Sequence, residues 1–285
     1  MNQMYLLLFG VLALGGLVGL VSGSDDDDEL EPLPDDIFDG RESIEGTDEA
    51  DTITGSALDE VVQSYAGDDS VTAGAGNDYV YSGRGDDTVV ADPGDDAVFL
   101  GADDDLYITA SPADDMGNDT ISGGSGDDTI STGRGVHVIH GDDEDDDVDG
   151  GDDSITSLNG RDSIFGGDGE DFISGLDDAG TQAERADFID GGDGDDTIHG
   201  DGFDTLDGGD GSDRYILRAD ADGAAQVNYG SGDRVIVTYD DSYPGAGNLT
   251  VEQDGENSRV LLDGRVVAVL PTTLAGDVRA ELQRA

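Results

Sequence analysis

Apolar side chains recur once in every nine residues between Ile37 and Ile216. The frame is clearest in GGSGDDTIS (123–131), where the eighth position is Ile130. Nineteen such units follow one another, interrupted by the insertions TASPA (109–113) and GLDDAGT (175–181), and the units 150–156 and 200–207 are shortened. The eighth position is apolar or aromatic throughout: Ile44, Ile53, Val62, Val71, Val80, Val89, Val98, Tyr107, Ile121, Ile130, Ile139, Val148, Ile155, Ile164, Ile173, Ile189, Ile198, Leu206 and Tyr215. A fixed period of this kind predicts a repeat architecture.

Two polar columns accompany the apolar one. The sixth position is Asp in sixteen of the nineteen units, the exceptions being Glu42, Glu60 and His137, and the fourth position is Gly in fourteen. Glycines followed by Asp suit a tight turn that needs positive φ. The next three residues, such as Thr-Ile-Ser, suit a short strand with one buried side chain. Each unit therefore predicts one turn and one strand.

One buried side chain cannot offset the entropy of ordering nine residues, so the units must stack. If successive units run in opposite directions, a complete coil takes two units, and equivalent turns lie eighteen residues apart on the same side. This predicts two edges of acidic turns, one with Asp51, Asp69, Asp87 and Asp105 and the other with Glu60, Asp78 and Asp96.

The charge of the chain makes this stack unfavourable without a cation. Acidic residues number 69 against 12 basic ones, for a formal net charge of −57, and neighbouring strands lie about 4.8 Å apart. Carboxylates and turn carbonyls are hard oxygen ligands, which favour calcium over magnesium with its rigid octahedral shell. The chain has no Cys and three His, so softer metals are disfavoured. The same charge repels nucleic acid and anionic lipid.

The units GGSGDDTIS, GGDGEDFIS, GGDGDDTIH and GGDGSDRYI resemble the nonapeptide G-G-x-G-x-D-x-U-x of the repeats-in-toxin (RTX, hemolysin-type) calcium-binding proteins, in which U is a large apolar residue. The resemblance covers roughly residues 37 to 216. It implies an all-β fold, a parallel β-roll with several calcium ions between neighbouring turns. The sixth-position Asp side chains and carbonyls of the glycine-rich segments would hold the ions.

Carried over residue by residue, the resemblance assigns calcium to sixteen carboxylates. The units that match best contain Asp69, Asp78, Asp87, Asp96, Asp128, Asp171, Asp196 and Asp213. Units that lack a glycine, are shortened or follow an insertion contain Asp51, Asp105, Asp119, Asp146, Asp153, Asp162, Asp187 and Asp204. His137 stands where Asp is expected, which puts a calcium site at that turn in question.

The N-terminal segment 1–23 contains an uncharged apolar run, 4–22, long enough to span a bilayer. It fits a cleaved signal peptide, although it lacks a basic n-region, and it fits equally a retained membrane anchor. Residues 24–36 form an acidic linker with Pro32 and Pro34.

Residues 217–285 leave the nonapeptide frame and predict a β-rich cap on the open end of the roll. Longer antiparallel strands are expected at RVIVTY (234–239), NLTVEQ (248–253), SRVLLD (258–263) and RVVAVL (265–270). A terminal helix over 273–285 is expected from Leu274, Val278 and Leu282. The family resemblance adds a second role for this end, an uncleaved signal for a type I secretion apparatus.

The sequence predicts no enzyme, because neither an H-E-x-x-H nor a G-x-S-x-G motif occurs and no separate catalytic domain is left over. The leading hypothesis is a secreted or cell-surface calcium-binding protein that folds on binding calcium, with a structural, adhesive or surface role. Its protein or polysaccharide partner is not indicated. Two alternatives stay open, a polysaccharide-acting enzyme that uses an acidic face of the roll and a disordered acidic protein that binds cations diffusely.

Overall fold

A computed structural model describes residues 40–109, 117–133, 135–142, 152–157, 161–176, 186–219, 223–240 and 243–284. The regular structure in these residues is entirely β. The described ranges contain no helix that is long and apolar enough to cross a membrane. The apolar run 4–22 and the acidic linker 24–36 lie outside the described residues.

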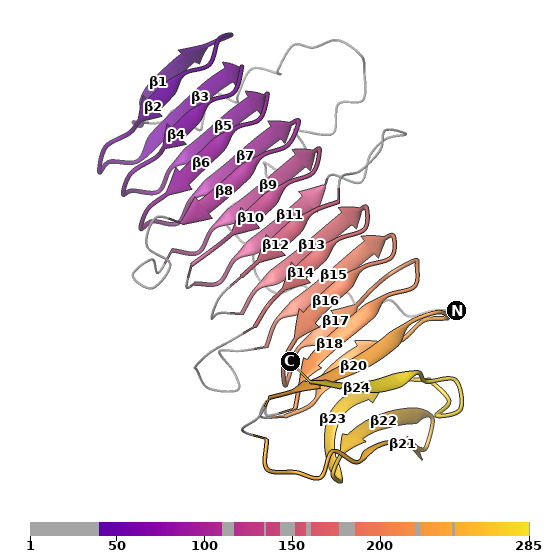
Figure 1. Cartoon of the computed structure of the whole chain (residues 1–285). Coiled ribbons are helices and arrows are strands. Elements are labelled where there is room, and N and C mark those ends of the chain that lie inside the picture. Colours follow the sequence, from indigo (N-terminus) through magenta and orange to yellow (C-terminus); the bar gives the residue numbers. More distant parts are fainter. Residues whose placement is uncertain are drawn as a thin grey trace.

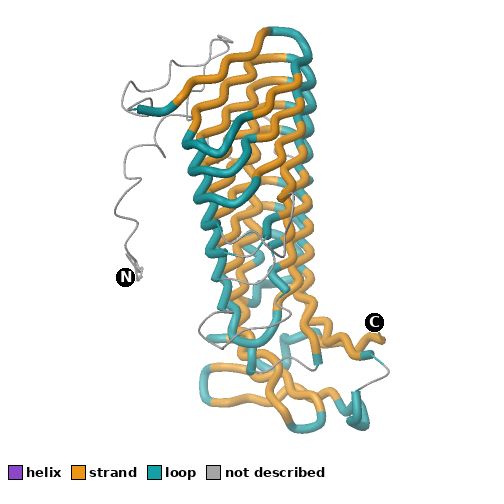
Figure 2. The backbone as a smooth tube through the Cα atoms, turned by 90° about the vertical axis from the view of Figure 1, so that its left-hand side faces the viewer, coloured by secondary structure: helices purple, strands orange, loops and turns teal. Residues whose placement is uncertain are grey.

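The strands form two sheets, which the chain visits alternately (Figures 1 and 2). The first sheet consists, in spatial order, of β1 (Glu42–Thr47), β3 (Glu60–Ala66), β5 (Tyr79–Arg84), β7 (Ala97–Ala102), β9 (Thr120–Ser125), β11 (Val138–Asp142), β13 (Ser163–Asp168), β15 (Phe188–Asp193), β17 (Thr205–Asp207), β19 (Ala225–Asn228), β23 (Arg265–Leu270), β22 (Asn257–Leu262) and β21 (Leu249–Asp254). The second sheet consists of β2 (Thr52–Thr54), β4 (Ser70–Thr72), β6 (Thr88–Ala91), β8 (Leu106–Thr109), β10 (Thr129–Ser131), β12 (Ser154–Thr156), β14 (Phe172–Ser174), β16 (Thr197–Gly200), β18 (Arg214–Arg218), β20 (Arg234–Tyr239) and β24 (Ala280–Arg284).

Strands within each sheet run parallel as far as β20, in the register that the period predicts. Val62 on β3 pairs with Val80 on β5, eighteen residues later, and Val71 on β4 pairs with Val89 on β6. The predicted parallel β-roll, with two units in each coil, is therefore confirmed.

The eighth-position side chains of the two sheets face each other and form the core. From Val62 to Tyr215 those in the described residues are fully buried, and they belong to one continuous apolar cluster. Only a thin layer of side chains lies between the sheets, because most of the short strands point a single large residue inward, although β7 buries both Val98 and Leu100. The core is accordingly long and narrow.

The turns need glycine because adjacent coils approach each other through their backbones. Gly192, near the end of β15, has a φ of 104°, and a Cβ there would lie 2.0 Å from the carbonyl oxygen of Gly167 in the preceding coil. Both the left-handed backbone and the contact exclude a larger residue without a shift of one coil.

The coil of β10 and β11 is followed directly by the coil of β12 and β13. The unit around Val148, with its predicted ligand Asp146, lies outside the described residues, but β10 pairs directly with β12 and β11 with β13. No position is left between these coils for a further strand.

The roll extends beyond Ile216, and the prediction that RVIVTY is antiparallel is wrong. β20 pairs in parallel with β18, Val237 opposite Leu217, because the preceding Gly-Ser-Gly-Asp (230–233) supplies one more turn of the repeat type. β21, β22 and β23 form the predicted antiparallel strands and cap the stack, shown in yellow in Figure 1. Their buried residues, among them Val260 and Leu262, continue the core of the roll.

The terminal helix predicted for 273–285 is also wrong. Ala280–Arg284 forms β24, which pairs in parallel with β20, Leu282 opposite Val237. Val278, Ala280 and Leu282 alternate with polar residues and pack partly buried against the core, whereas Leu274 is 63% exposed. The period of two, together with an edge of β20 that needs hydrogen-bond partners, decides in favour of a strand.

Replacing Gly192 by Ala tests the backbone contact between coils. We expect Gly192→Ala to lower the free energy of unfolding by about 1–3 kcal/mol, because the left-handed φ and the carbonyl of Gly167 both oppose a Cβ. The measurement is urea denaturation at saturating calcium. Gly276→Ala is the matched control, since a Cβ at Gly276 meets nothing within 4 Å, and it should change the stability by about 0.5 kcal/mol or less. Equal effects of the two substitutions would contradict the packing described here.

Candidate metal centres

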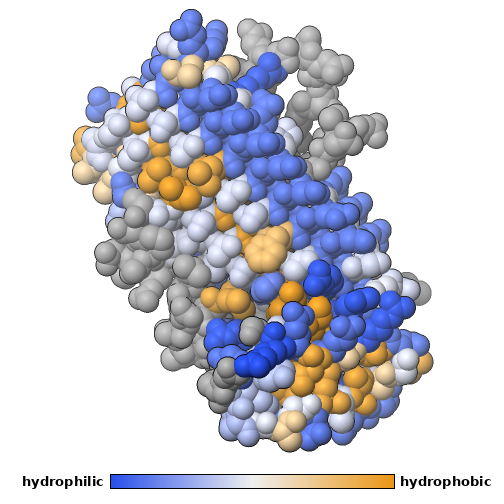
Figure 3. Space-filling view, viewed as in Figure 1, coloured by the Kyte–Doolittle hydropathy of each residue, from blue (hydrophilic) through white to orange (hydrophobic). Residues whose placement is uncertain are grey.

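The sixth positions line the two edges of the roll as two columns. The first edge lies where the odd-numbered strands end, along the right of Figure 1, and the second edge lies where the even-numbered strands end. Figure 3 shows a band of hydrophilic residues that follows the right side of the roll along its length. The first edge contains Asp51, Asp69, Asp87, Asp105, Asp128, Asp153, Asp171, Asp196, Asp213 and Asp233. The second contains Glu60, Asp78, Asp96, Asp119, His137, Asp162, Asp187 and Asp204.

A ladder of hydrogen bonds orients the carboxylates of the first edge. The backbone N–H of Asp69 donates to Oδ1 of Asp87 (2.7 Å), and that of Asp87 donates to Oδ1 of Asp105 (2.8 Å). The same bond recurs up to Asp213, whose N–H donates to Oδ1 of Asp233 (3.2 Å). One oxygen of each carboxylate from Asp69 to Asp233 is thereby fixed to the preceding coil.

The other oxygen, Oδ2, is buried without a hydrogen-bond donor at several rungs. Within the described residues this holds for Asp69, Asp87, Asp105, Asp196 and Asp213 on the first edge, and for Asp78 on the second. A buried carboxylate oxygen without a partner costs roughly 1–3 kcal/mol or more. A cation beside each Oδ2 would remove that cost.

Carbonyl oxygens of the glycine-rich turns converge on the same places. A Cβ built on Gly166 would lie 2.2 Å from Oδ2 of Asp171 and 2.3 Å from the carbonyl oxygen of Gly191, one coil later. Gly123 has the same relation to Asp128 and to the carbonyl of Gly141. Glycine at the first position of the unit thus leaves room for a carboxylate and a carbonyl from adjacent coils to meet.

This donor set fits calcium. Calcium takes six to eight oxygen ligands from carboxylates, carbonyls and water. Within the described residues no three acidic, His or Cys side chains gather around one point, so carbonyls must supply a large part of any shell. A mixed set of carboxylate and carbonyl oxygens suits calcium and disfavours zinc or copper, which prefer nitrogen and sulfur.

Burial and like charges hold the ladder carboxylates close to neutrality in the absence of a cation. Burial raises the pKa of Asp87 to about 7 and the pKa of Asp105 to about 8, and neighbouring Asp side chains raise both. Burial also raises the pKa of Asp196 and of Asp213 to about 7, and that of Asp78 to about 6. Hydrogen bonds from the adjacent coil act in the opposite direction and do not overcome burial.

The fifth positions form a second, exposed ladder that runs the other way. The N–H of Asp127 donates to Oδ1 of Asp104 in the preceding coil (3.0 Å), and the N–H of Asp152 donates to Oδ1 of Asp127 (3.0 Å). The adjacent aspartates of each turn therefore have separate tasks. The fifth-position Asp hydrogen-bonds to the preceding coil at the surface, and the sixth-position Asp faces the interior of the edge.

The structure brings fifteen of the sixteen predicted ligands into the two columns, while Asp146 lies outside the described residues. The backbone N–H of Asp128 donates directly to Oδ1 of Asp153 (2.8 Å), so these two residues are neighbours in the column of the first edge. Sequence reasoning missed Asp233, which is 1% exposed and completes the first edge. The signal was present, since Asp233 and Val235 keep the sixth and eighth positions of a unit whose glycines are displaced by one.

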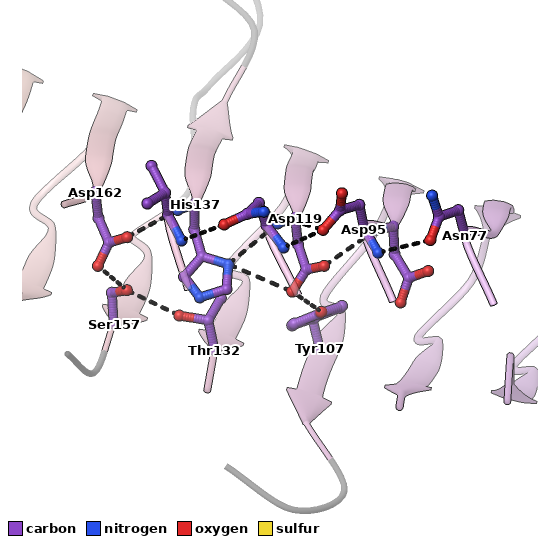
Figure 4. A network of polar contacts seen from close by, with 11 residues as sticks. Asn77, Asp95, Tyr107, Asp119, Thr132, His137, Ser157 and Asp162 are labelled. Atoms are coloured by element: carbon purple, nitrogen blue, oxygen red, sulfur yellow. Dashed lines mark hydrogen bonds and ion pairs between the residues drawn. The ribbon is translucent and has the colours of Figure 1, made fainter. Parts of the chain in front are cut away.

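His137 occupies a rung of the second edge (Figure 4). Its Nδ1 accepts the N–H of Asp119 (3.3 Å), and its own N–H donates to Oδ1 of Asp162 (2.8 Å). His140 faces outward instead, where its ring stacks on Phe165 with 4.8 Å between centroids. The two residues are close in sequence but belong to different surroundings.

Comparison with known protein families agrees with the repeat. The model of the RTX calcium-binding nonapeptide repeat (4 copies) matches residues 36–57, 54–89, 82–107, 115–136, 147–181, 184–204 and 200–223, more than half of the chain. No curated protein matches the chain. The RTX nonapeptide repeats bind several calcium ions, and this chain, with its matching repeats stacked as a parallel β-roll, belongs to the RTX calcium-binding nonapeptide-repeat family.

Proposed function

We propose that this chain is an exported, non-catalytic protein whose roll folds when calcium binds, and that the ordered roll has a structural or adhesive role at or outside the cell surface. The observation that carries the proposal is the row of buried Oδ2 atoms without donors along the first edge, one of which, in Asp196, lies near the turn carbonyl of Gly208. The proposed ligands are the Asp residues of the first edge together with Asp78 and Asp96 of the second edge.

Calcium would act here by changing the sign of the electrostatics along each edge. Without the ion, carboxylates on coils about 4.8 Å apart repel one another and oppose stacking. With the ion, two neighbouring coils share one positive charge centre, so the free energy of binding becomes free energy of folding. Extracellular calcium modules work at about 10⁻⁴ to 10⁻³ M, which supports folding outside the cell rather than inside.

Two segments are candidate export signals. Residues 4–22 have the length and hydropathy of a signal peptide or an anchor, and residues 217–285 are the alternative, as a type I secretion signal. In the described part of 217–285 the strands β21 to β24 cover the end of the core, which supports a capping role for this region.

A non-catalytic role is supported by what the acidic residues do. Described carboxylates at the fifth and sixth positions hold neighbouring coils by hydrogen bonds. Adjacent pairs such as Asp127 and Asp128 are therefore occupied by the architecture, and the repeat accounts for them without an acid–base role.

Removing two carboxylates from the first edge tests the ligand assignment. We expect Asp196→Asn with Asp213→Asn to bind fewer calcium ions and to need a several-fold higher calcium concentration for half-folding, because the variant loses two negative ligands of adjacent coils. Calorimetric titration gives the stoichiometry, and far-UV circular dichroism gives the folding midpoint. Asp193→Asn with Asp210→Asn is the control, with the same change of charge at exposed third positions. An unchanged ion count in the first variant would refute the assignment.

The raised pKa values predict an acid-induced gain of structure in chelator. Because the folded-state pKa values of Asp78, Asp87, Asp105 and Asp213 lie at about 6 to 8, above the ordinary 3.8, the metal-free roll is favoured at low pH. That stabilisation is lost as the pH rises through 6 to 8. In excess chelator, β structure measured by circular dichroism should therefore increase between pH 8 and pH 5. At saturating calcium the signal should stay nearly constant, and a gain of β structure with rising pH in chelator would contradict the account.

A further inference from the structure

At Asp162 the second edge differs from the first edge in what meets the second carboxylate oxygen. On the first edge, Oδ2 of Asp87, Asp105 and Asp196 is buried without a donor. On the second edge, Oδ2 of Asp162 accepts a hydrogen bond from the hydroxyl of Ser157 (2.6 Å). At Asp162 the hydroxyl of Ser157 therefore takes the place that a cation would have beside Oδ2 on the first edge.

The hydroxyl groups come from the position that glycine occupies at the best-matching turns. Ser157 and Thr132 stand five residues before Asp162 and His137, as Gly166 and Gly191 stand five before Asp171 and Asp196. Ser157 Oγ and Thr132 Oγ1 are 2.9 Å apart, and both residues are at most 1% exposed. In these two adjacent coils, hydroxyl groups thus fill the space beside the sixth-position residue that glycine leaves open in other turns.

His137 completes this arrangement from the neighbouring rung. Its imidazole accepts the N–H of Asp119 through Nδ1, the bond that a carboxylate Oδ1 accepts at every other joint of the two columns. The series of hydrogen bonds between coils therefore continues through His137, although His137 has no carboxylate to offer a cation. Figure 4 shows the result, a chain of contacts from Asp119 through His137 and Asp162 to Ser157 and Thr132.

We propose that His137, Ser157 and Thr132 close the second edge without calcium, so that the ions of this edge are interrupted here while those of the first edge are continuous. The inference rests on the proposed function, in which sixth-position Asp residues are calcium ligands. It follows from two substitutions that coincide on adjacent coils, a ligand replaced by imidazole and an ion cavity filled by hydroxyl groups. Either change alone would weaken a site, and together they supply a complete metal-free joint.

The decisive experiment gives the turns of His137 and Asp162 the residues found on the first edge, an Asp at the sixth position and a Gly at the first. The variant His137→Asp with Ser157→Gly should bind at least one more calcium ion per chain than the natural protein, measured by calorimetric titration and by atomic absorption after equilibrium dialysis. His140→Asp with Ser122→Gly is the matched control, because it makes the same chemical changes on outward-facing positions of β9 and β11. The control should leave the ion count unchanged.

A second variant covers the case in which the conversion prevents folding. Asp162→Asn should leave the number of bound calcium ions unchanged, because Ser157 and not an ion meets its Oδ2, whereas Asp196→Asn should lose at least one. Loss of an ion from Asp162→Asn, or no gain in a folded His137→Asp, Ser157→Gly variant, would overturn the inference. A natural protein that bound no calcium would instead refute the proposed function, so the two failures are distinguishable.

Discussion

The structure depends on the hydrogen bond between the backbone of one coil and the carboxylate of the next. This bond fixes Oδ1 of each sixth-position Asp and therefore aims Oδ2 into the edge, close to the glycine carbonyls. The bond brings like charges together rather than separating them, and burial, followed by the neighbouring charges of Asp128 and Asp87, raises the pKa of Asp105 to about 8. A fold built on such contacts is incomplete without something positive between its coils.

The thin core explains why the edges carry so much of the stability. Most strands of the roll contribute one large buried side chain, such as Ile164 or Ile173, and no helix covers either sheet in the described residues. Apolar burial of this extent cannot offset the entropy of ordering so many glycines. Disulfides, the usual supplement in small-core extracellular proteins, are excluded by the absence of Cys. Metal coordination at the turns would therefore add to the hydrogen bonds that hold the coils together.

Much of this could be predicted from the sequence because period, turn and strand agree at every unit. The stacking of eighteen-residue coils and the two acidic edges follow directly from the columns. The direct pairing of β10 with β12 and of β11 with β13 could not be predicted, because the unit around Val148 matches the repeat pattern in sequence as well as its neighbours do. The terminal strand was mistaken for a helix because Leu274, Val278 and Leu282 fit a period of four as well as Val278, Ala280 and Leu282 fit a period of two. Which positions along an edge need a cation could not be predicted, because this depends on single hydroxyl groups such as that of Ser157, whose partners only the folded geometry reveals.

The alternation of the chain between two sheets constrains how such a protein can change its length. Removing or duplicating one nine-residue unit would move every later strand to the opposite sheet and exchange the two columns of turns. Two units together would preserve both. Whether the number of preceding units is even or odd thus decides the sheet to which every later strand belongs. Repeats should therefore be gained or lost in pairs during evolution, and a single extra unit should be tolerated only as a loop outside the stack.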